Sequence, residues 1–366
     1  MYNIISVSVI AVLLALLARV KGVKNGLEWS FVLLTVFLAI RYDFGNDYMP
    51  YLDSFKSYKT SSIGLFEFDR YYQLRDKREL LWVLLNLLFK PLGFFSLVIV
   101  MTVFENFVIY KFIKKYVDRE WYWLAVFIFT FTTSLMLVGA SMMRQWLALC
   151  IFLLCIDFIQ RGKPLPYFIL MLLATQIHSS AWVLLPVYFV RYIPSRISKS
   201  FLYFAVPLYL VWLYFAPSLY GNNLELLLQA EEVEKYGVYL EDERTSYSII
   251  GIIARYLFPV ICLLQVNRIE GPKRMLFLIF SFYLLVLPLT DVTPMIGRIG
   301  TYFQVLFIVV FPETICCIRK NNSFLYLPIL VVYLLLTLYN YFPFFRSFTF
   351  GEHYQVYQTI FSQPWM

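Results

Sequence analysis

The sequence predicts an all-α protein that crosses a membrane many times. Of its 366 residues, 61% are apolar and only 15% are charged, and the mean hydropathy is +0.69. Soluble domains carry about 25% charged residues, so this chain lacks the polar surface that a protein in water needs. Several apolar runs reach about 20 residues, the length at which a helix crosses a hydrocarbon core. Two shorter runs, from Ile4 to Leu17 and from Phe324 to Leu338, carry no charge.

We expect about ten transmembrane helices in a single membrane domain that includes residues 1–366. The first run has no basic segment before it and no small-residue cleavage site after it, so we interpret it as a retained span rather than a signal peptide. The predicted spans lie near residues 3–19, 26–40, 93–113, 121–138, 143–159, 200–217, 249–266, 275–289, 299–318 and 324–342.

The net charge of +8 arises from short basic clusters between the apolar runs. This distribution is typical of membrane orientation signals, and it argues against nucleic acid as a partner. If all the clusters face the cytoplasm, the loops 41–78 and 218–248 and the aromatic tail 343–366 lie outside it. The clusters lie at residues 19–24, 111–119, 161–163, 191–199, 268–274 and 319–320.

Two apolar segments do not fit a simple count of one membrane crossing for each apolar segment. The proposed orientation requires residues 79–90 to enter the membrane without crossing it, and residues 166–190 to form a re-entrant hairpin with His178 at its tip. Polar residues interrupt the second segment near Gln176 and His178, and non-helical backbone at that depth must line protein or a water-filled cavity. One ordinary span over 166–190 is the alternative.

Neither a cofactor nor a metal site is predicted. The five cysteines lie in or beside apolar spans, with an odd number and no metal-ligand spacing, so we expect buried thiols. The sequence contains no phosphate-binding loop, dinucleotide fingerprint, zinc-protease motif or nucleophile elbow.

A polar motif runs from Arg41 to Tyr51, where the second apolar run ends. Gly45 permits a turn with positive φ, and Asp47 can cap a helix whose apolar face lies in the membrane interface. That interpretation requires no catalysis. In the functional alternative, Arg41 holds a phosphate while Asp47 contacts or deprotonates a sugar hydroxyl. The expected face is Tyr48, Tyr51, Leu52 and Phe55.

Three further arginines, Arg144, Arg255 and Arg298, lie at or inside apolar spans without an acid within four residues. A charge at the centre of a bilayer costs at least about 2.5–3.5 kcal/mol. Each arginine can reach the interface or pair with an acid distant in sequence. Alternatively, the three share an anionic ligand with Arg41, and the planar guanidinium suits phosphate.

His178 is one of two histidines, and His353 lies in the aromatic tail. A histidine beside Gln176 and Ser179 can be a hydrogen-bonded packing residue. It can also act as a general base, or donate a hydrogen bond to a pyrophosphate oxygen. The tail aromatics form either an interfacial belt, a cover over a lipid-facing groove, or stacking faces for sugar rings.

The ordered set of motifs resembles the EpsG-like branch of the Wzy polysaccharide polymerases. The resemblance extends over residues 26–310, and Asn46 stands where that family usually has Thr or Ser. It rests on Arg41…Gly45-Asn46-Asp47-Tyr48…Tyr51, on Met143-Arg144-Gln145 followed by His178-Ser179-Ser180-Ala181, and on Arg298…Tyr302-Phe303.

The resemblance implies a GT-C-like glycosyltransferase in the bacterial inner membrane, with its active site facing the periplasm. It would join undecaprenyl-pyrophosphate-linked repeat units of O-antigen or exopolysaccharide and release undecaprenyl pyrophosphate. Membrane lipid and a chain-length regulator protein are further expected partners. The expected pyrophosphate ligands are Arg41, Arg144, Arg298 and Arg255, the catalytic groups His178 and Asp47, and the sugar contacts Tyr48, Tyr51, Gln145 and Tyr302.

Two other functions use similar residues. A lipid-linked oligosaccharide flippase or another transporter would place arginines in a cavity, but it would more naturally show internal repeats. A membrane acyltransferase acting on sugars would also use a histidine, yet the sequence lacks a His-x4-Asp motif.

Overall fold

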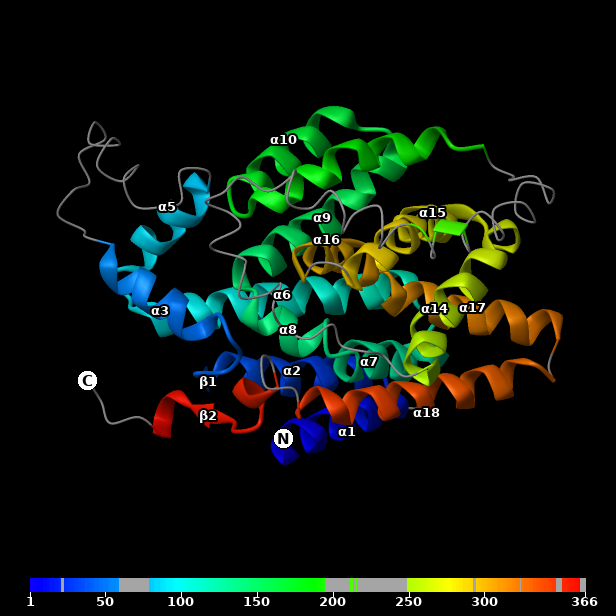
Figure 1. The fold of residues 1–366 in the computed structure, drawn as a ribbon, viewed down its shortest axis with the longest axis horizontal. Coiled ribbons are helices and arrows are strands. Elements are labelled where there is room, and N and C mark those ends of the chain that lie inside the picture. Colours follow the sequence, from blue (N-terminus) through cyan, green and yellow to red (C-terminus); the bar gives the residue numbers. More distant parts are fainter. Residues whose placement is uncertain are drawn as a thin grey trace. The chain divides into compact units, whose positions relative to one another are not determined.

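The computed structural model describes residues 1–20, 23–58, 79–194, 211–212, 215, 249–291, 294–322, 324–346 and 351–362. The chain divides into two compact units, and Figure 1 shows their helices. Unit 1 is Met1–Tyr188 with Leu338–Met366, and unit 2 is Phe189–Thr337. Most of the predicted span 200–217, the loop 218–248 and residues 59–78 of the first loop lie outside the described residues.

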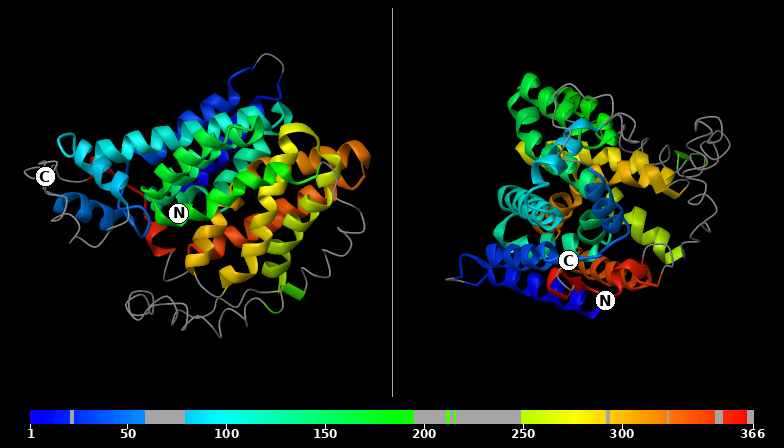
Figure 2. Two further views of the ribbon diagram at one scale, coloured as in Figure 1. Left: turned by 90° about the horizontal axis from the view of Figure 1, so that it is seen from above. Right: turned by 90° about the vertical axis from the view of Figure 1, so that its left-hand side faces the viewer.

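Unit 1 is a helical bundle with one short strand pair. Helix α1 packs against α2 and α7, α2 against α6, and α9 against both α6 and α10 (Figures 1 and 2). The elements are α1 (Tyr2–Leu17), α2 (Gly26–Ala39), β1 (Arg41–Tyr42), α3 (Tyr48–Ser57), α5 (Leu80–Phe89), α6 (Phe94–Tyr116), η2 (Arg119–Trp121), α7 (Tyr122–Phe131), α8 (Met136–Ser141), α9 (Met143–Arg161), α10 (Pro164–Thr175), η3 (Ser179–Tyr192), η6 (Glu352–Tyr354), β2 (Gln358–Thr359) and η7 (Ile360–Ser362).

In unit 2, α15 packs against α14, α16 and α17. Its core is aromatic: the ring of Phe311 lies 4.1 Å from that of Tyr333, and Phe258 packs against both. The elements are α14 (Ile249–Leu264), η4 (Val266–Arg268), α15 (Gly271–Val286), η5 (Leu287–Asp291), α16 (Pro294–Gln304), α17 (Phe307–Asn321) and α18 (Tyr326–Phe344), whose last residues belong to unit 1.

Within the described ranges, four helices are long and apolar enough to cross a membrane, or five if the bent pair Gly297–Gln304 and Phe307–Asn321 is one span. The predicted count of about ten is therefore not confirmed. Helices α1 and α2 occur where expected but have only 16 and 14 residues. The predicted span 121–138 is divided, because α7 ends at Phe131 and Thr132 is extended before α8 begins.

A tight turn sets α10 against α9. Gly162 takes a left-handed conformation with φ 68° and donates its N–H to Ile159 O, while Lys163 N–H bonds to Phe158 O at 2.9 Å. This is a glycine-closed helix end, and Pro164 then begins α10 at a position where its missing N–H costs nothing. The chain therefore reverses direction at the basic residues 161–163.

The chain reverses again at His178. The Tyr167 hydroxyl donates to Leu184 O at 2.6 Å, and the rings of Tyr167 and Tyr188 are 5.4 Å apart. One straight helix would separate residues 167 and 188 by about 30 Å. The alternative of an ordinary span over 166–190 is therefore wrong, and the predicted fold-back with His178 at the tip is confirmed.

Helices α6 and α9 run parallel. Lys115 near the end of α6 pairs with Asp157 near the end of α9, while Met143 at the start of α9 packs in one cluster with Met101. Arg19 also pairs with Glu120, at 3.5 Å. The described residues of three basic clusters (19–24, 111–119 and 161–163) therefore gather at one end of unit 1, as the orientation argument requires. Along α9, Arg144 lies about 25 Å from Arg161.

The predicted apolar face of α3 is confirmed. Its buried residues pack against Trp82 of α5 and Phe94 of α6. Asp47 occupies the N-cap position, but its side chain makes no capping hydrogen bond, so the capping prediction is right in position and wrong in bonding. The buried residues are Tyr48, Tyr51, Leu52 and Phe55.

The described part of the C-terminal tail packs onto the loop that follows α2. Strand β2 pairs antiparallel with β1, with Arg41 opposite Thr359, and Ile360 N–H bonds to Ile40 O at 3.0 Å. The Tyr357 ring stacks on Phe37 at 4.1 Å. These aromatics therefore cover part of unit 1 itself.

Candidate functional site

The loop between Arg41 and Asp47 is fixed to the segment before α9. Gly45 has φ +90°, which confirms the predicted turn. A Cβ there would lie 2.6 Å from Ser141 Cβ and 2.9 Å from the Tyr354 hydroxyl. The Asp47 N–H donates to Ser141 Oγ at 3.1 Å. Glycine is therefore needed at this position for its backbone angle and for the space around it.

Arg41 is buried, with 2% of its surface exposed. Its guanidinium donates to Leu38 O, to Thr102 Oγ1 at 2.7 Å and to Ala140 O at 3.0 Å. Its own carbonyl accepts the Tyr48 hydroxyl at 3.1 Å. The side chain thereby joins the ends of α2 and α8 to α6, and the structure favours a role for Arg41 inside the loop over direct contact with a ligand.

Arg41 shares this interior with an acid. A small cavity is lined by both Arg41 and Glu105, together with Thr102, Asn106 and Trp146. Glu105 on α6 is 6% exposed, and both its Oε1 and Arg41 Nε are buried without a hydrogen-bond partner among the described residues. The two side chains therefore share one cavity between the helices without a direct ion pair.

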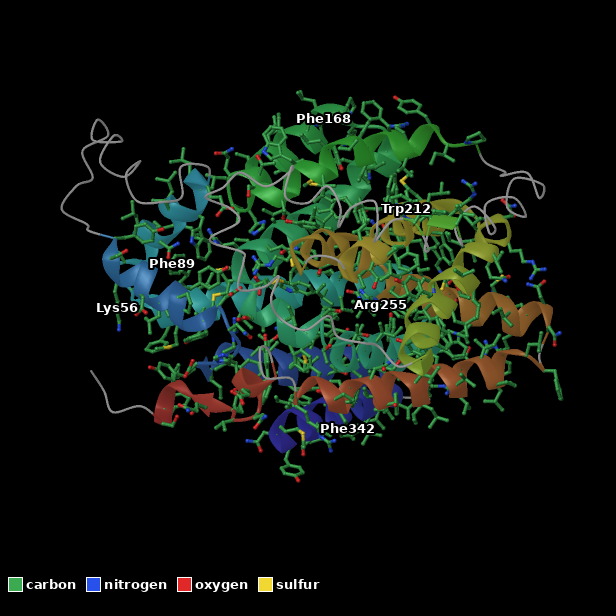
Figure 3. All side chains as sticks on the ribbon, viewed as in Figure 1. Lys56, Phe89, Phe168, Trp212, Arg255 and Phe342 are labelled. Carbon is green, nitrogen blue, oxygen red and sulfur yellow. The ribbon has the colours of Figure 1, made fainter. Side chains whose placement is uncertain are left out.

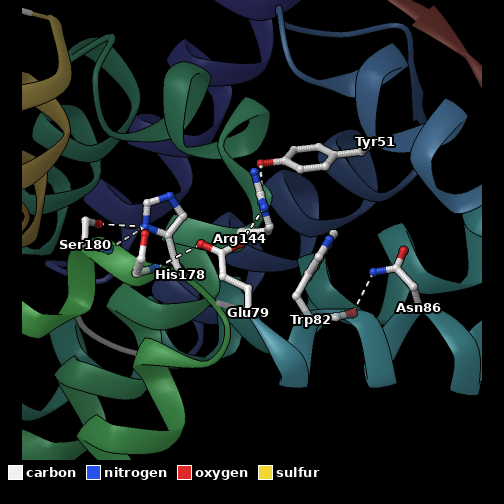
Figure 4. Close-up of polar contacts among 8 residues, drawn as sticks. Tyr51, Glu79, Trp82, Asn86, Arg144, His178 and Ser180 are labelled. Atoms are coloured by element: carbon white, nitrogen blue, oxygen red, sulfur yellow. Dashed lines mark hydrogen bonds and ion pairs between the residues drawn. The ribbon is translucent and has the colours of Figure 1, made fainter. Parts of the chain in front are cut away.

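Arg144 lies in the first turn of α9 and has a partner far away in the sequence. Its Nη1 forms an ion pair with the Glu79 carboxylate, and its Nε lies 3.4 Å from the Tyr51 hydroxyl (Figure 4). The guanidinium carbon is 5.4 Å from the centre of the Tyr51 ring, within cation–π range. The Arg144 side chain is 23% exposed and that of Glu79 is 8% exposed, so the arginine can be reached from outside.

The start of α5 and the tip of the α10–η3 hairpin hold each other. Gln176 O accepts the N–H groups of Leu81 and Trp82 at 3.0 and 3.3 Å, two of the amides that a helix leaves unpaired in its first turn. In return, the Glu79 carboxylate accepts the Ser179 N–H at 2.9 Å. These reciprocal bonds place the hairpin tip beside Arg144.

His178 is oriented by the next turn of the hairpin. Its Nδ1 lies 2.7 Å from Ser180 Oγ, and the Ser180 N–H donates to the same nitrogen at 3.3 Å. Because a backbone N–H can only donate, Nδ1 is an acceptor here, and the neutral ring carries its proton on Nε2. This geometry favours a ring that donates from Nε2 over a ring that accepts a proton there.

The structure therefore brings together some of the predicted residues. Tyr51, Arg144 and His178 come from three segments, and Glu79 joins them (Figure 4). Gln145 is buried beside Arg144, with 2% exposed.

The remaining predicted residues lie in unit 2. Arg255 is on α14 (Figure 3), and both Arg298 and Tyr302 are on α16. Both arginines are half-buried, and Tyr302 is fully buried.

Sequence reasoning missed Glu79. The signal was its position, since it is the acid directly before the uncharged helix α5. All five cysteines are buried thiols. In the described ranges, no group of three or more His, Cys, Asp or Glu side chains could hold a metal ion.

A model of the EpsG family matches residues 29–360. The chain belongs to the EpsG family. The match includes both the group around Arg144 and the arginines of unit 2. Membership in the EpsG family and the long apolar helices together identify a helical membrane protein of the polysaccharide-polymerase type. No curated protein and no solved structure matches the chain.

Proposed function

We propose that this EpsG-family protein is a glycosyltransferase that polymerises lipid-linked oligosaccharide repeat units. One observation carries the proposal: an accessible arginine, an oriented histidine and a tyrosine ring meet at the end of unit 1 opposite its basic clusters. Basic clusters favour the cytoplasmic side. We therefore place the reaction at the periplasmic or outer face of the inner membrane.

In the proposed reaction, a hydroxyl oxygen of the acceptor's terminal sugar attacks the anomeric carbon of the donor glycan. The bond from that carbon to the pyrophosphate oxygen breaks, and its electron pair leaves with undecaprenyl pyrophosphate. The hydroxyl proton passes to a base beside the acceptor, for which Asp47 is the proposed group, because the contacts of His178 favour a donor. The step needs stabilisation of charge on the leaving pyrophosphate.

Arg144 supplies that stabilisation, because a guanidinium can donate parallel hydrogen bonds to phosphate oxygens. A neutral His178 that carries its proton on Nε2 would add a further donor. The buried Tyr51 ring, which lies against the guanidinium and against Trp82, would hold Arg144 in position. Arg41 would hold the loop that carries Asp47, and Arg298 and Arg255 remain pyrophosphate ligands predicted from the sequence.

Lengthening of a defined substrate tests this function. The purified full chain is incubated with the lipid-linked repeat unit extracted from its own host, without a flippase and without nucleotide sugars. We expect glycans of two or more repeat units by mass spectrometry, and none with Arg144→Ala. A folded preparation that leaves the repeat unit unchanged contradicts the proposal. Movement of the unlengthened substrate across sealed vesicles would instead identify a transporter.

A further inference from the structure

The Glu79 carboxylate is bound as an anion would be bound. One oxygen pairs with Arg144 Nη1, and the other accepts the Ser179 N–H at 2.9 Å. The two donors come from different segments, the first turn of α9 and the tip of the hairpin. A guanidinium and a backbone amide that converge on one oxyanion are donors that phosphate also uses.

We propose that Arg144 and the Ser179 amide form a phosphate site that Glu79 occupies in the unliganded protein, and that a phosphate group of the substrate displaces this carboxylate. The identity of that substrate as a lipid-linked pyrophosphate rests on the proposed function. The displacement itself requires only that the incoming anion binds the same two donors.

Charge explains why one anion must replace the other. Two negative groups at one site disfavour each other, and their repulsion is strong when both are partly buried. A phosphate brings more negative charge and more acceptor oxygens than a carboxylate, so it can bind both donors and still contact His178. Glu79 is also the N-cap residue of α5, and a displaced carboxylate near a helix N-terminus remains favoured.

The displacement gives Glu79 a function in each cycle. Without substrate, it satisfies Arg144 and holds the hairpin tip in place. After the reaction, it competes with the bound pyrophosphate product and so favours its release. Removing the charge of Glu79 should therefore tighten anion binding. If Glu79 only oriented Arg144, removing its charge would instead weaken anion binding.

The test uses the purified full chain in detergent, with inorganic pyrophosphate and farnesyl pyrophosphate as probes in calorimetric titrations. Glu79→Gln keeps the side-chain size and an acceptor for the Ser179 N–H but removes the charge. We expect both probes to bind at least about tenfold more tightly to this variant than to the unaltered protein. Such a factor corresponds to about 1.4 kcal/mol. Equal or weaker binding to Glu79→Gln overturns the proposal.

Two further variants make the test independent of one substitution. Glu79→Asp keeps the charge, but its side chain is too short to bridge both donors. The two pyrophosphate probes should therefore also bind more tightly to this variant. It replaces Glu79→Gln in the test if that variant does not fold. Glu28→Gln removes a carboxylate that pairs with Lys114 at the opposite end of unit 1 and should leave binding unchanged. An equal gain in that variant would show a general charge effect and overturn the site.

The binding assay separates this inference from the proposed function. Tighter binding to Glu79→Gln without any lengthening by the unaltered protein refutes only the polymerase. Lengthening by the unaltered protein, with no gain in binding for Glu79→Gln or Glu79→Asp, refutes only the displacement.

Discussion

Arg144 and Glu79 form an ion pair across 65 residues of sequence. The pair joins the start of α9 to the start of α5, and through Ser179 it reaches the hairpin tip. Since the arginine stays partly exposed while the carboxylate is nearly buried, the positive charge is the part of the pair that a ligand meets first.

Arg144→Lys should slow glycan lengthening by about 10²–10³-fold, the usual cost of one donor to a developing charge. Lysine keeps the charge but loses the planar fork that binds two oxygens. Initial rates with the host's lipid-linked repeat unit measure this effect. Lys111→Arg, on the distant half of α6, is the matched control and should keep the full rate. If Arg144→Lys lengthens glycan as fast as the unaltered protein, the planar guanidinium of Arg144 does not bind the leaving group through two oxygens.

Substitutions of His178 distinguish its two possible functions. Glutamine can donate a hydrogen bond but cannot accept a proton at neutral pH. If His178 donates from Nε2, as its contacts with Ser180 favour, His178→Gln should retain lengthening within about tenfold of the original rate while His178→Ala loses it. Total loss of lengthening in both variants would identify His178 as the general base. His353→Ala, with an exposed side chain in the tail, should behave as the unaltered protein.

Gly45→Ala should destabilise unit 1 by about 2–4 kcal/mol, from its strained backbone and its close contacts. The added Cβ meets Ser141 at 2.6 Å. Gly93→Ala is the matched control, because Gly93 has a similar φ of +86° but open space around its Cβ position. Thermal unfolding in detergent should therefore show the larger decrease in Tm for Gly45→Ala. Equal decreases would mean that the crowding at Ser141 is relieved at no cost.

Arg41→Met should destabilise the protein by about 3–5 kcal/mol, because the buried carbonyl oxygens of Leu38 and Ala140 and the Thr102 hydroxyl lose their donor. Thermal unfolding in detergent should show this loss as a lower Tm. The folded fraction of Arg41→Met should bind pyrophosphate with unchanged affinity. A large loss of affinity with a normal Tm would instead make Arg41 a ligand.

Local patterns predicted the local features of this molecule. The polar interruption near His178 and the arrangement of basic clusters together predicted the fold-back, and the apolar spacing after Asp47 predicted the buried face of α3. The positive φ at Gly45 followed from its place in a polar motif. The turn and the buried face depend on residues close together in the sequence, whereas the fold-back also required the basic clusters along the whole chain.

Pairings made by tertiary structure were not predictable in this way. Nothing near Arg144 indicates Glu79, and nothing near Arg41 indicates that Thr102 and Ala140 accept its hydrogen bonds. Hydropathy also predicted one span over 121–138, because an apolar run does not reveal that its helix stops at Phe131.

The pairing of β1 with β2 has a consequence for biosynthesis. Arg41 lies opposite Thr359, so the loop that carries Gly45 and Asp47 is among the first parts made and among the last to be completed. During translation, the early helices can enter the membrane while this loop still lacks its partner strand, because long-range contacts form only after the intervening chain exists. Chains released from the ribosome that stop before residue 351 should therefore leave the loop open to protease, and released chains that include residue 360 should protect it.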